Sequence, residues 1–194
     1  MKILPWIITC VLIIFIIFYH HTHHKNTPTR PIEAEIEHYY LKGLTEQWLG
    51  NEGLEVKNVQ LFYGNDSSQI KSLYDLIKKP TLIFCVSGRM CSSCIQFGLS
   101  KMKEYFGEIE NNPDVIFIVS DITPREKKVL YHNQCYSYLQ ASETLKLPIE
   151  SSAIPFFFIM DTDQKVKMLF YPDSTNPMYT EKYLEIVSRR MIKK

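Results

Sequence analysis

Cys91 and Cys94 are the residues of this sequence whose type and spacing most suggest chemistry. They follow an apolar, β-prone run, Thr81 to Val86, and a short turn, and they precede an amphipathic run that is typical of a helix. This order predicts that Cys91 lies at or just before a helix N-terminus, where free backbone N–H groups and the positive end of the helix dipole favour a thiolate. Cys94 then lies one turn further along, within reach of Cys91 for a small disulfide ring. Dithiol–disulfide exchange needs this arrangement.

The elements that must position the two cysteines follow from hydrophobic periodicity and turn residues. The sequence predicts strands over residues 54–63, 81–86, 115–119, 152–160 and 165–171. It predicts helices over residues 68–77, 94–110, 124–140 and 179–191. Strands that alternate with helices and then close with a hairpin indicate an α/β domain, with a sheet of mixed strand direction covered by helices on both faces.

The N-terminal part of the chain is organised differently from this domain. Residues 3–19 form a continuous uncharged run with Trp6 and Tyr19 near its ends, and we interpret residues 1–19 as a transmembrane signal anchor. A cleaved signal peptide is the alternative, but bulky residues follow the run where a small-x-small cleavage site would be needed. We expect a linker over residues 20–31, a juxtadomain helix over residues 32–53 and the globular domain over residues 54–194.

Composition limits the remaining function classes. The formal net charge is +1 and the basic residues are scattered, so nothing indicates a nucleic-acid-binding surface. Five cysteines in 194 residues are too few for a disulfide-rich scaffold. The linker carries histidines that could bind a metal or could simply form a polar segment next to a membrane, namely His20, His21, His23 and His24. We favour the second interpretation and expect no metal site and no cofactor.

Two motifs give the sequence its resemblance to a known family. The first is the Cys-Ser-Ser-Cys motif of residues 91–94, which follows a buried strand. The second is the Ile-Pro pair of residues 154–155, which opens a later strand that is followed by a hairpin. With these motifs, residues 54–194 resemble the thioredoxin fold, and look most like membrane-tethered thiol-disulfide oxidoreductases of the TlpA/ResA type. The resemblance implies a thioredoxin-like three-layer sandwich with a mixed central sheet, here preceded by an N-terminal transmembrane helix.

The resemblance also implies roles for individual residues. In the family, the proline of the second motif has a cis peptide bond and lies against the disulfide, and the backbone of the residue before it pairs with substrate chains. These roles fall on Pro155 and Ile154, while Met90 stands where the family commonly has a tryptophan. We therefore expect Cys91 and Cys94 to be catalytic. We expect Met90, Ile154 and Pro155 to bind substrate.

Two departures from the family pattern concern proton and charge balance at the site. Thioredoxins carry a buried acid six residues before the first cysteine, whereas this chain has Cys85 there. Proton transfer from Cys94 must then use another group or water. The residues between the two cysteines, Ser92 and Ser93, offer hydroxyls that can donate to a thiolate, and Arg89 can stabilise it electrostatically. Both effects would make the dithiol pair more oxidising.

The function implied is thiol-disulfide exchange with protein substrates. We expect Cys91 to attack a substrate disulfide and Cys94 to resolve the mixed disulfide. The expected partners are protein thiols or disulfides and a membrane or periplasmic electron donor. Such chemistry suits an oxidising compartment, so we place the domain on the periplasmic face of a bacterial inner membrane, held by a single-pass anchor.

Other function classes fit the sequence less well. A structural zinc site needs a second ligand pair, and Cys85, Cys135 and His132 do not repeat the cysteine spacing. A peroxidase would need a Pro-x-x-x-Thr-x-x-Cys-like motif, which the residues before Cys91 lack. A copper-handling thioredoxin-like module remains open, with His132 and the linker histidines as further ligands. A non-catalytic thioredoxin-like adaptor is the remaining alternative.

Overall fold

The chain forms two units in a computed structural model, Met1–Thr45 and Glu46–Lys194. The structure describes residues 12–15, 18–19, 42–43, 45–46, 48–63, 66–87, 90–109, 112–121, 123 and 139–192. In the first unit, all the described residues are helical. Within this described set, no helix has both the length and the apolar character needed to cross a membrane. Most of the expected anchor and all of the expected linker, residues 20–31, lie outside the described residues.

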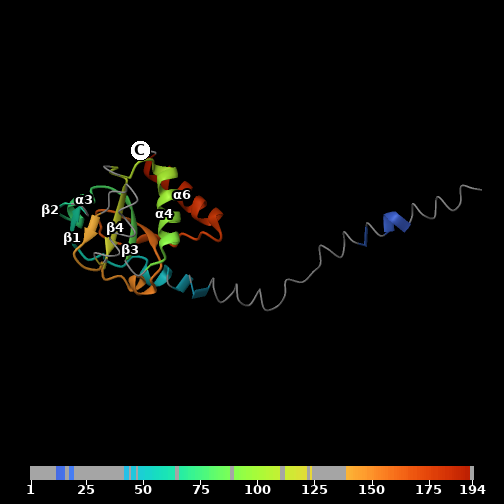
Figure 1. The fold of residues 1–194 in the computed structure, drawn as a ribbon, viewed down its shortest axis with the longest axis horizontal. Coiled ribbons are helices and arrows are strands. Elements are labelled where there is room, and N and C mark those ends of the chain that lie inside the picture. Colours follow the sequence, from blue (N-terminus) through green and yellow to red (C-terminus); the bar gives the residue numbers. More distant parts are fainter. Residues whose placement is uncertain are drawn as a thin grey trace, which may run out of the picture. The chain divides into compact units, whose positions relative to one another are not determined.

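A mixed β-sheet forms the centre of the second unit (Figure 1). Its described strands are β1 (Gln60–Tyr63), β2 (Asp66–Ser72), β3 (Thr81–Ser87), β4 (Val115–Ser120), β5 (Leu139–Ala141), β6 (Phe156–Met160) and β7 (Lys167–Phe170). They are ordered β2-β1-β5-β4-β3-β6-β7. The three strands β3, β4 and β5 run parallel, whereas β1, β2, β6 and β7 are antiparallel to their neighbours. The expected sheet of mixed strand direction is therefore confirmed.

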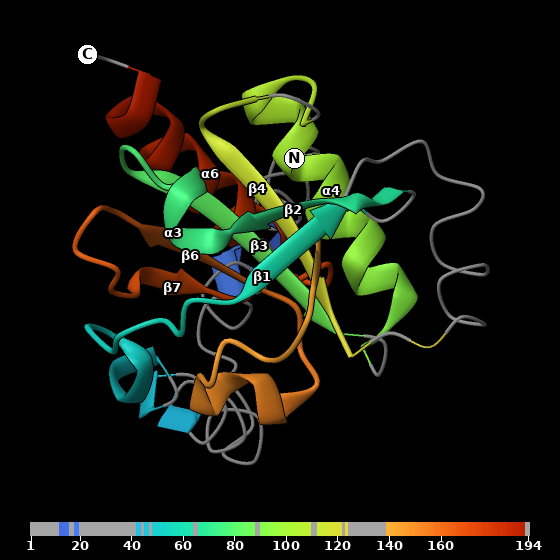
Figure 2. The same ribbon diagram turned by 90° about the vertical axis from the view of Figure 1, so that its left-hand side faces the viewer.

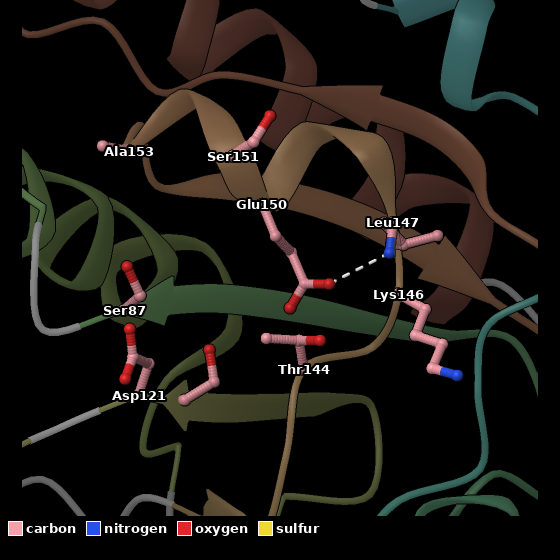
Figure 3. A pocket seen from close by; sticks show the side chains of 9 residues that line it. Ser87, Asp121, Thr144, Lys146, Leu147, Glu150, Ser151 and Ala153 are labelled. Carbon is pink, nitrogen blue, oxygen red and sulfur yellow. Dashed lines mark hydrogen bonds between the residues drawn. The ribbon is translucent and has the colours of Figure 1, made fainter.

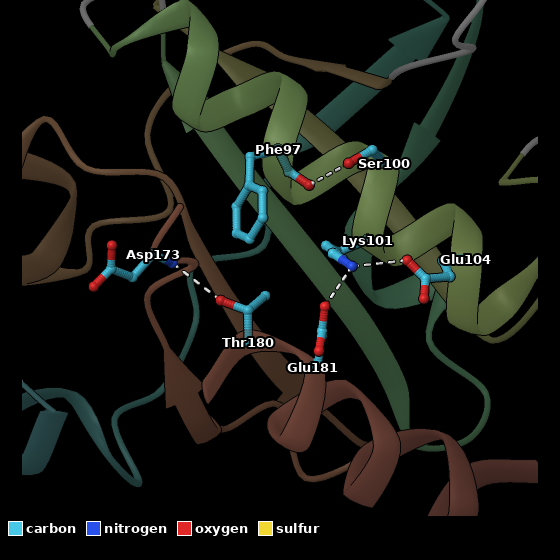
Figure 4. Close-up of polar contacts among 7 residues, drawn as sticks. All are labelled: Phe97, Ser100, Lys101, Glu104, Asp173, Thr180 and Glu181. Carbon is cyan, nitrogen blue, oxygen red and sulfur yellow. Dashed lines mark hydrogen bonds and ion pairs between the residues drawn. The ribbon is translucent and has the colours of Figure 1, made fainter. Parts of the chain in front are cut away.

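Two long helices pack together on one side of this sheet (Figures 1 and 2). They are α4 (Ser92–Phe106) and α6 (Pro177–Ile192); the described part of the chain also contains α3 (Leu73–Leu76) and the 3-10 helix η1 (Pro148–Ser152). Lys101 of α4 joins the two long helices, because its Nζ atom lies 2.6 Å from Glu181 on α6 and 2.9 Å from Glu104 (Figure 4). The helix expected over residues 124–140, which would cover the other face, falls mostly outside the described residues.

An aromatic row fixes α4 on the sheet. Phe84 of β3 is paired with Phe117 on β4 and with Phe157 on β6, and its ring centroid lies 5.6 Å and 4.4 Å from theirs. All three rings are buried. Gly98 of α4 lies against Phe84 so closely that an added Cβ atom would be 2.5 Å from the ring atom Cζ. Because side chains alternate along a strand, Cys85 and Ser87 point to the opposite face of the sheet from α4.

The segment over residues 66–76 differs from the expected helix. Residues 66–72 form β2, which pairs with β1 through contacts such as Leu61 with Lys71 and Phe62 with Ile70. The prediction was wrong because serine and aspartate compete with helical hydrogen bonds, and because Ile70 is 63% exposed and so supplies no buried helical face. Only α3 is helical, and it begins at the buried Leu73.

Two other expected elements are also corrected by strand pairing. The helix expected to continue to Gln140 has given way to a strand by Leu139, because β5 fills the space between β1 and β4 and pairs with both. The strand expected over residues 54–63 is limited to β1, since Glu55 makes only an isolated bridge with Lys165. In both segments, pairing with strands that are distant in sequence determines the secondary structure and overrides the local hydrophobic periodicity.

Candidate active site

The end of β3 delivers the first cysteine to the start of α4. β3 is buried along nearly its whole length and pairs on both sides, as expected of a central strand. After it, the Met90 N–H donates to the Ser87 carbonyl oxygen at 3.1 Å, and the Ser87 N–H donates to Met90 Sδ at 3.1 Å. Cys91 is then the N-cap of α4, and its carbonyl oxygen accepts the first helical bond from Ile95 at 3.1 Å. The predicted position of Cys91 at the helix N-terminus is confirmed.

Cys91 is the more easily ionised thiol of the pair. It is solvent-exposed, and its Sγ atom lies 3.0 Å from the Ser93 hydroxyl oxygen. Hydrogen bonds from Ser93 and from the backbone and thiol of Cys94 lower the pKa of Cys91 to about 7, with the Ser93 hydroxyl making the largest contribution. A thiolate at this place also faces the positive end of the α4 dipole.

Cys94 has the opposite environment. It is half-buried one turn into α4, and burial is the main reason that its pKa is raised. The hydrogen bond that it donates to Cys91 and the negative charge of that thiolate raise the pKa further, and the carboxylate of Asp173 adds to the effect. Asp173 lies in the loop before α6, where its backbone N–H donates to the buried Thr180 hydroxyl at 3.0 Å (Figure 4). The two thiols therefore differ in exposure and in the direction of their pKa shifts, so Cys91 ionises more readily than Cys94.

The Ile154–Pro155 pair lies beside the end of β3, the strand that precedes Cys91. The antiparallel register pairs Cys85 with Phe156, so the residues just before β6 run alongside the end of β3. Ile154 is 38% exposed, and its backbone makes no hydrogen bond with any described residue. Pro155 is buried. Sequence reasoning placed both residues at the site, and the structure brings them to the same edge of the sheet as Cys91.

One expectation about the Ile154–Pro155 pair needs correction. Every described peptide bond is trans, including the bond before Pro155, so the expected cis bond is not found. The bend before β6 is made instead at Ala153, whose left-handed backbone (φ 54, ψ 27) ends η1. Met90 is only 6% exposed. Its side chain belongs to the core and its Sδ atom accepts the Ser87 N–H, and the expected contact of Met90 with substrate stays a prediction.

Sequence reasoning missed Glu150. This half-buried residue extends from η1, and its carboxylate accepts the backbone N–H groups of Leu145 and Leu147, each at 3.0 Å. Burial raises the pKa of Glu150. Its charge also acts on the thiol of Cys85, whose pKa is raised well above its usual value, mainly by complete burial and further by the Glu150 charge. Pro148 at the first helical position and a glutamate at the third are the sequence signal for this arrangement.

Several residues weighed from the sequence fall outside the described part of the chain. They are His20, His21, His23, His24, Arg89, His132 and Cys135. Within the described part, no group of three or more histidine, cysteine, aspartate or glutamate side chains is placed to hold a metal ion.

Comparison with known proteins supports the fold. No protein-family model and no curated protein matches the sequence. The structure of a candidate protein disulfide isomerase from Bacteroides thetaiotaomicron aligns over 74% of this chain and 91% of that one, with a TM-score of 0.53 and 10% sequence identity. This chain has a thioredoxin-like fold.

Other solved structures of the thioredoxin-like group also align with it. A candidate thiol:disulfide interchange protein DsbE from Chlorobium tepidum covers 71% of this chain and 97% of its own length, with a TM-score of 0.48 and 9% identity. Copper-bound ScoI from Bradyrhizobium japonicum covers 70% of this chain and 99% of its own length, with a TM-score of 0.45 and 18% identity. Identities this low speak to the fold alone.

The thioredoxin-like fold places three chemically distinct features at one edge of its sheet. An exposed thiol with a lowered pKa, Cys91, sits beside a half-buried thiol with a raised pKa, Cys94. The backbone of Ile154, which has no hydrogen-bond partner among the described residues, runs alongside the end of β3. Such a set can attack a disulfide, hold the attached chain and release it by internal disulfide formation.

Proposed function

We propose that this chain is a thiol-disulfide oxidoreductase whose redox couple is Cys91–Cys94. The observation that carries the proposal is the asymmetry of the two thiols. Cys91 is exposed with a pKa of about 7, while Cys94 is half-buried with a raised pKa. An attacking thiol works best when its pKa is near the ambient pH, and the resolving thiol must stay protonated until the mixed disulfide has formed.

The reaction balances without a cofactor. The Cys91 thiolate attacks one sulfur of a substrate disulfide, the substrate S–S bond breaks, and the leaving thiolate takes up a proton. Cys94 then loses its proton and attacks the Cys91 sulfur, which releases the second substrate thiol. The substrate gains two electrons and two protons, and Cys91–Cys94 becomes a disulfide. The reverse sequence oxidises a substrate dithiol.

The backbone around Ile154 suits substrate binding. Its N–H and C=O groups have no hydrogen-bond partner among the described residues, and they lie just before the first paired residue of β6. A substrate chain in extended conformation can add to this edge through main-chain hydrogen bonds, which hold many different sequences. Pro155, the residue after Ile154, is buried.

We also propose that the protein works outside the cytosol, attached to the membrane. Support comes from the uncharged run of residues 3–19 and from the preference of dithiol chemistry for oxidising compartments. On this proposal a membrane or periplasmic electron donor restores the redox state of the Cys91–Cys94 pair after each turnover. Fractionation of cells that express the full chain, with protease access to the domain from the periplasmic side, tests the placement.

Reaction of the purified full chain with a fluorescent disulfide peptide tests the activity. The wild-type chain is expected to cleave the peptide with release of two thiols, and both Cys91→Ser and Cys94→Ser are expected to stop turnover. Absence of cleavage by the wild type would contradict the proposal. Stoichiometric copper binding that depends on Cys91, in a chain that does not cleave the peptide, would favour the copper-handling alternative.

A further inference from the structure

A cavity lined by several polar side chains opens at the carboxyl ends of β3 and β4 (Figure 3). Because Ser87 points away from α4, the cavity lies on the opposite face of the sheet. Its volume is about 350 Å³, more than ten times the roughly 30 Å³ that one water molecule occupies in the liquid. The strand ends contribute Ser87, Ser120 and Asp121 to its wall. The segment that leads through η1 to β6 contributes Thr144, Glu150 and Ala153.

This cavity borders both segments of the proposed active site. Ser87 is the last residue of β3, and the turn after it leads directly to Cys91. Ala153 immediately precedes Ile154, whose backbone is the proposed substrate-binding edge. A polypeptide bound at Ile154 and joined to Cys91 would therefore place a neighbouring side chain at the mouth of the cavity.

Glu150 gives the cavity a negative charge that no described cation neutralises. Its carboxylate is half-buried and accepts backbone N–H groups, but it forms no ion pair within the described residues. The side chain of Lys146 also lines the cavity, yet Figure 3 shows its amino group pointing away from Glu150. Burial without a counter-charge raises the pKa of Glu150. A cation bound in the cavity would remove part of this cost.

Other side chains that carry oxygen atoms line the same cavity as Glu150. Ser120 is 2% exposed, and within the described residues its hydroxyl makes a single contact, 3.5 Å from the Val86 carbonyl oxygen. The hydroxyls of Ser87 and Thr144 have no partner among the described residues. Asp121 adds a second carboxylate at the strand end (Figure 3). Hydroxyl and carboxylate oxygens accept hydrogen bonds from ammonium and guanidinium groups, which donate and never accept.

We propose that this cavity is a specificity subsite for the side chain of a lysine or arginine that flanks the reactive cysteine of the protein substrate. The inference rests on the proposed function and adds a substrate class to it. Complementary charge at such a subsite raises the rate of productive encounter and selects among substrates that the backbone edge alone would accept equally.

Exchange kinetics with three disulfide peptides test this inference in the full chain. The peptides are identical except for one residue beside the cysteine, which is lysine, glutamate or norleucine. Each rate is divided by the rate of the same peptide with dithiothreitol, which removes the intrinsic effect of the neighbouring charge on the disulfide. We expect the lysine peptide to react about tenfold faster than the glutamate peptide, on the order found for partly buried charge pairs.

Variants of the cavity residues test whether a preference for the lysine peptide arises from this cavity. Glu150→Gln keeps one of the two oxygen acceptors that receive the Leu145 and Leu147 N–H groups, and Asp121→Asn suits the left-handed backbone at that position (φ 46). Either is expected to reduce the lysine preference to about threefold or less, and to leave the redox potential of the couple unchanged. Glu108→Gln is the matched control, because Glu108 follows the far end of α4 and pairs with Lys103. It is expected to leave the preference intact.

The outcomes separate the two proposals. If no peptide reacts, the proposed function fails. If all three peptides react at equal normalised rates, or if Glu150→Gln and Asp121→Asn both react with the wild-type preference, the subsite is refuted while the oxidoreductase stands. Thermal unfolding of each variant identifies one that has lost its fold, and the other variant then decides the result.

Discussion

The Sγ atom of Cys91 lies 3.0 Å from the hydroxyl oxygen of Ser93, two residues into the motif. The neighbouring Ser92 makes no hydrogen bond of this kind within the described part of the chain. A hydroxyl that donates to a thiolate favours the charged form, and this contact is the largest cause of the lowered pKa of Cys91. The reactivity of the Cys91 thiol therefore depends on Ser93 more than on Ser92.

Ser93→Ala is expected to raise the pKa of Cys91 above 7. The wild-type thiolate fraction is about one half at pH 7 and falls as the pH drops below 7, so the alkylation rate should rise through a midpoint near pH 7. In the variant the midpoint moves to higher pH, and a rise of one pKa unit would leave about a tenth of the thiol ionised at pH 7. The rate of reaction with iodoacetamide as a function of pH gives the midpoint for the wild type and the variant. Thiolate absorbance at 240 nm gives the ionised fraction of each.

Ser92→Ala is the matched control for this prediction. It removes a hydroxyl from the same turn of α4 without removing the contact to Cys91, so the midpoint should stay near pH 7. Equal shifts in both variants would show that the Ser93 hydroxyl is not the decisive group. Ser93→Ala should also lower the redox potential of the Cys91–Cys94 couple, because a less stable thiolate makes the reduced form less stable than in the wild type.

Cys94→Ser is expected to trap a mixed disulfide between Cys91 and a substrate peptide. The attacking thiol is the exposed one with the lowered pKa, and its removal in Cys91→Ser leaves only the half-buried thiol with the raised pKa. Intact-mass spectrometry after reaction with a disulfide peptide measures the adduct. A stable adduct on Cys91→Ser, and none on Cys94→Ser, would reverse the roles.

The parts of the site that follow from local sequence could be predicted. A buried strand, a turn and an amphipathic run fix where a helix begins, and so the position of Cys91 as the N-cap of α4 was expected. The pairing of β3 with β6 brings Ile154 to the same edge, as the resemblance implied. These features depend on periodicity and on a topology that few folds share.

Other features depend on contacts between distant segments and could not be predicted. β2 and β5 are strands because β1 offers pairing edges to both, although their own residues gave no clear strand signal. Glu150 lies far from Cys85 in sequence, and its charge acts on the Cys85 thiol only because the fold brings η1 near β3. No local pattern encodes either relationship, so sequence reasoning missed them.

Gly98→Ala is expected to destabilise the domain. The new methyl group would lie 2.5 Å from the Phe84 ring, which is fully buried and stacked between Phe117 and Phe157. Overpacking of this kind typically costs about 1–3 kcal/mol. Urea unfolding measures the loss. Gly50→Ala is the control, because Gly50 is helical with no atom near its added Cβ. Equal stability of Gly98→Ala and wild type would contradict the packing described.

Cys85 is expected to be inert in the native protein. It is 1% exposed, and burial together with the Glu150 charge raises the pKa of its thiol. Iodoacetamide at pH 8 should label Cys91 within minutes and Cys85 only after denaturant is added, as followed by peptide mass spectrometry. Labelling of Cys85 in the native chain at a rate similar to that of Cys91 would refute this assignment.

A redox titration of the purified full chain, with mass spectrometry of each cysteine, tests the central claim most directly. The account predicts one reversible two-electron couple between Cys91 and Cys94. Its potential should lie nearer the roughly −270 mV of thioredoxin, whose reactive cysteine has a pKa of about 7, than the roughly −120 mV of DsbA, whose cysteine has a pKa of about 3.5. If Cys91 and Cys94 form no disulfide with each other at any potential in the titration, the oxidoreductase account is wrong.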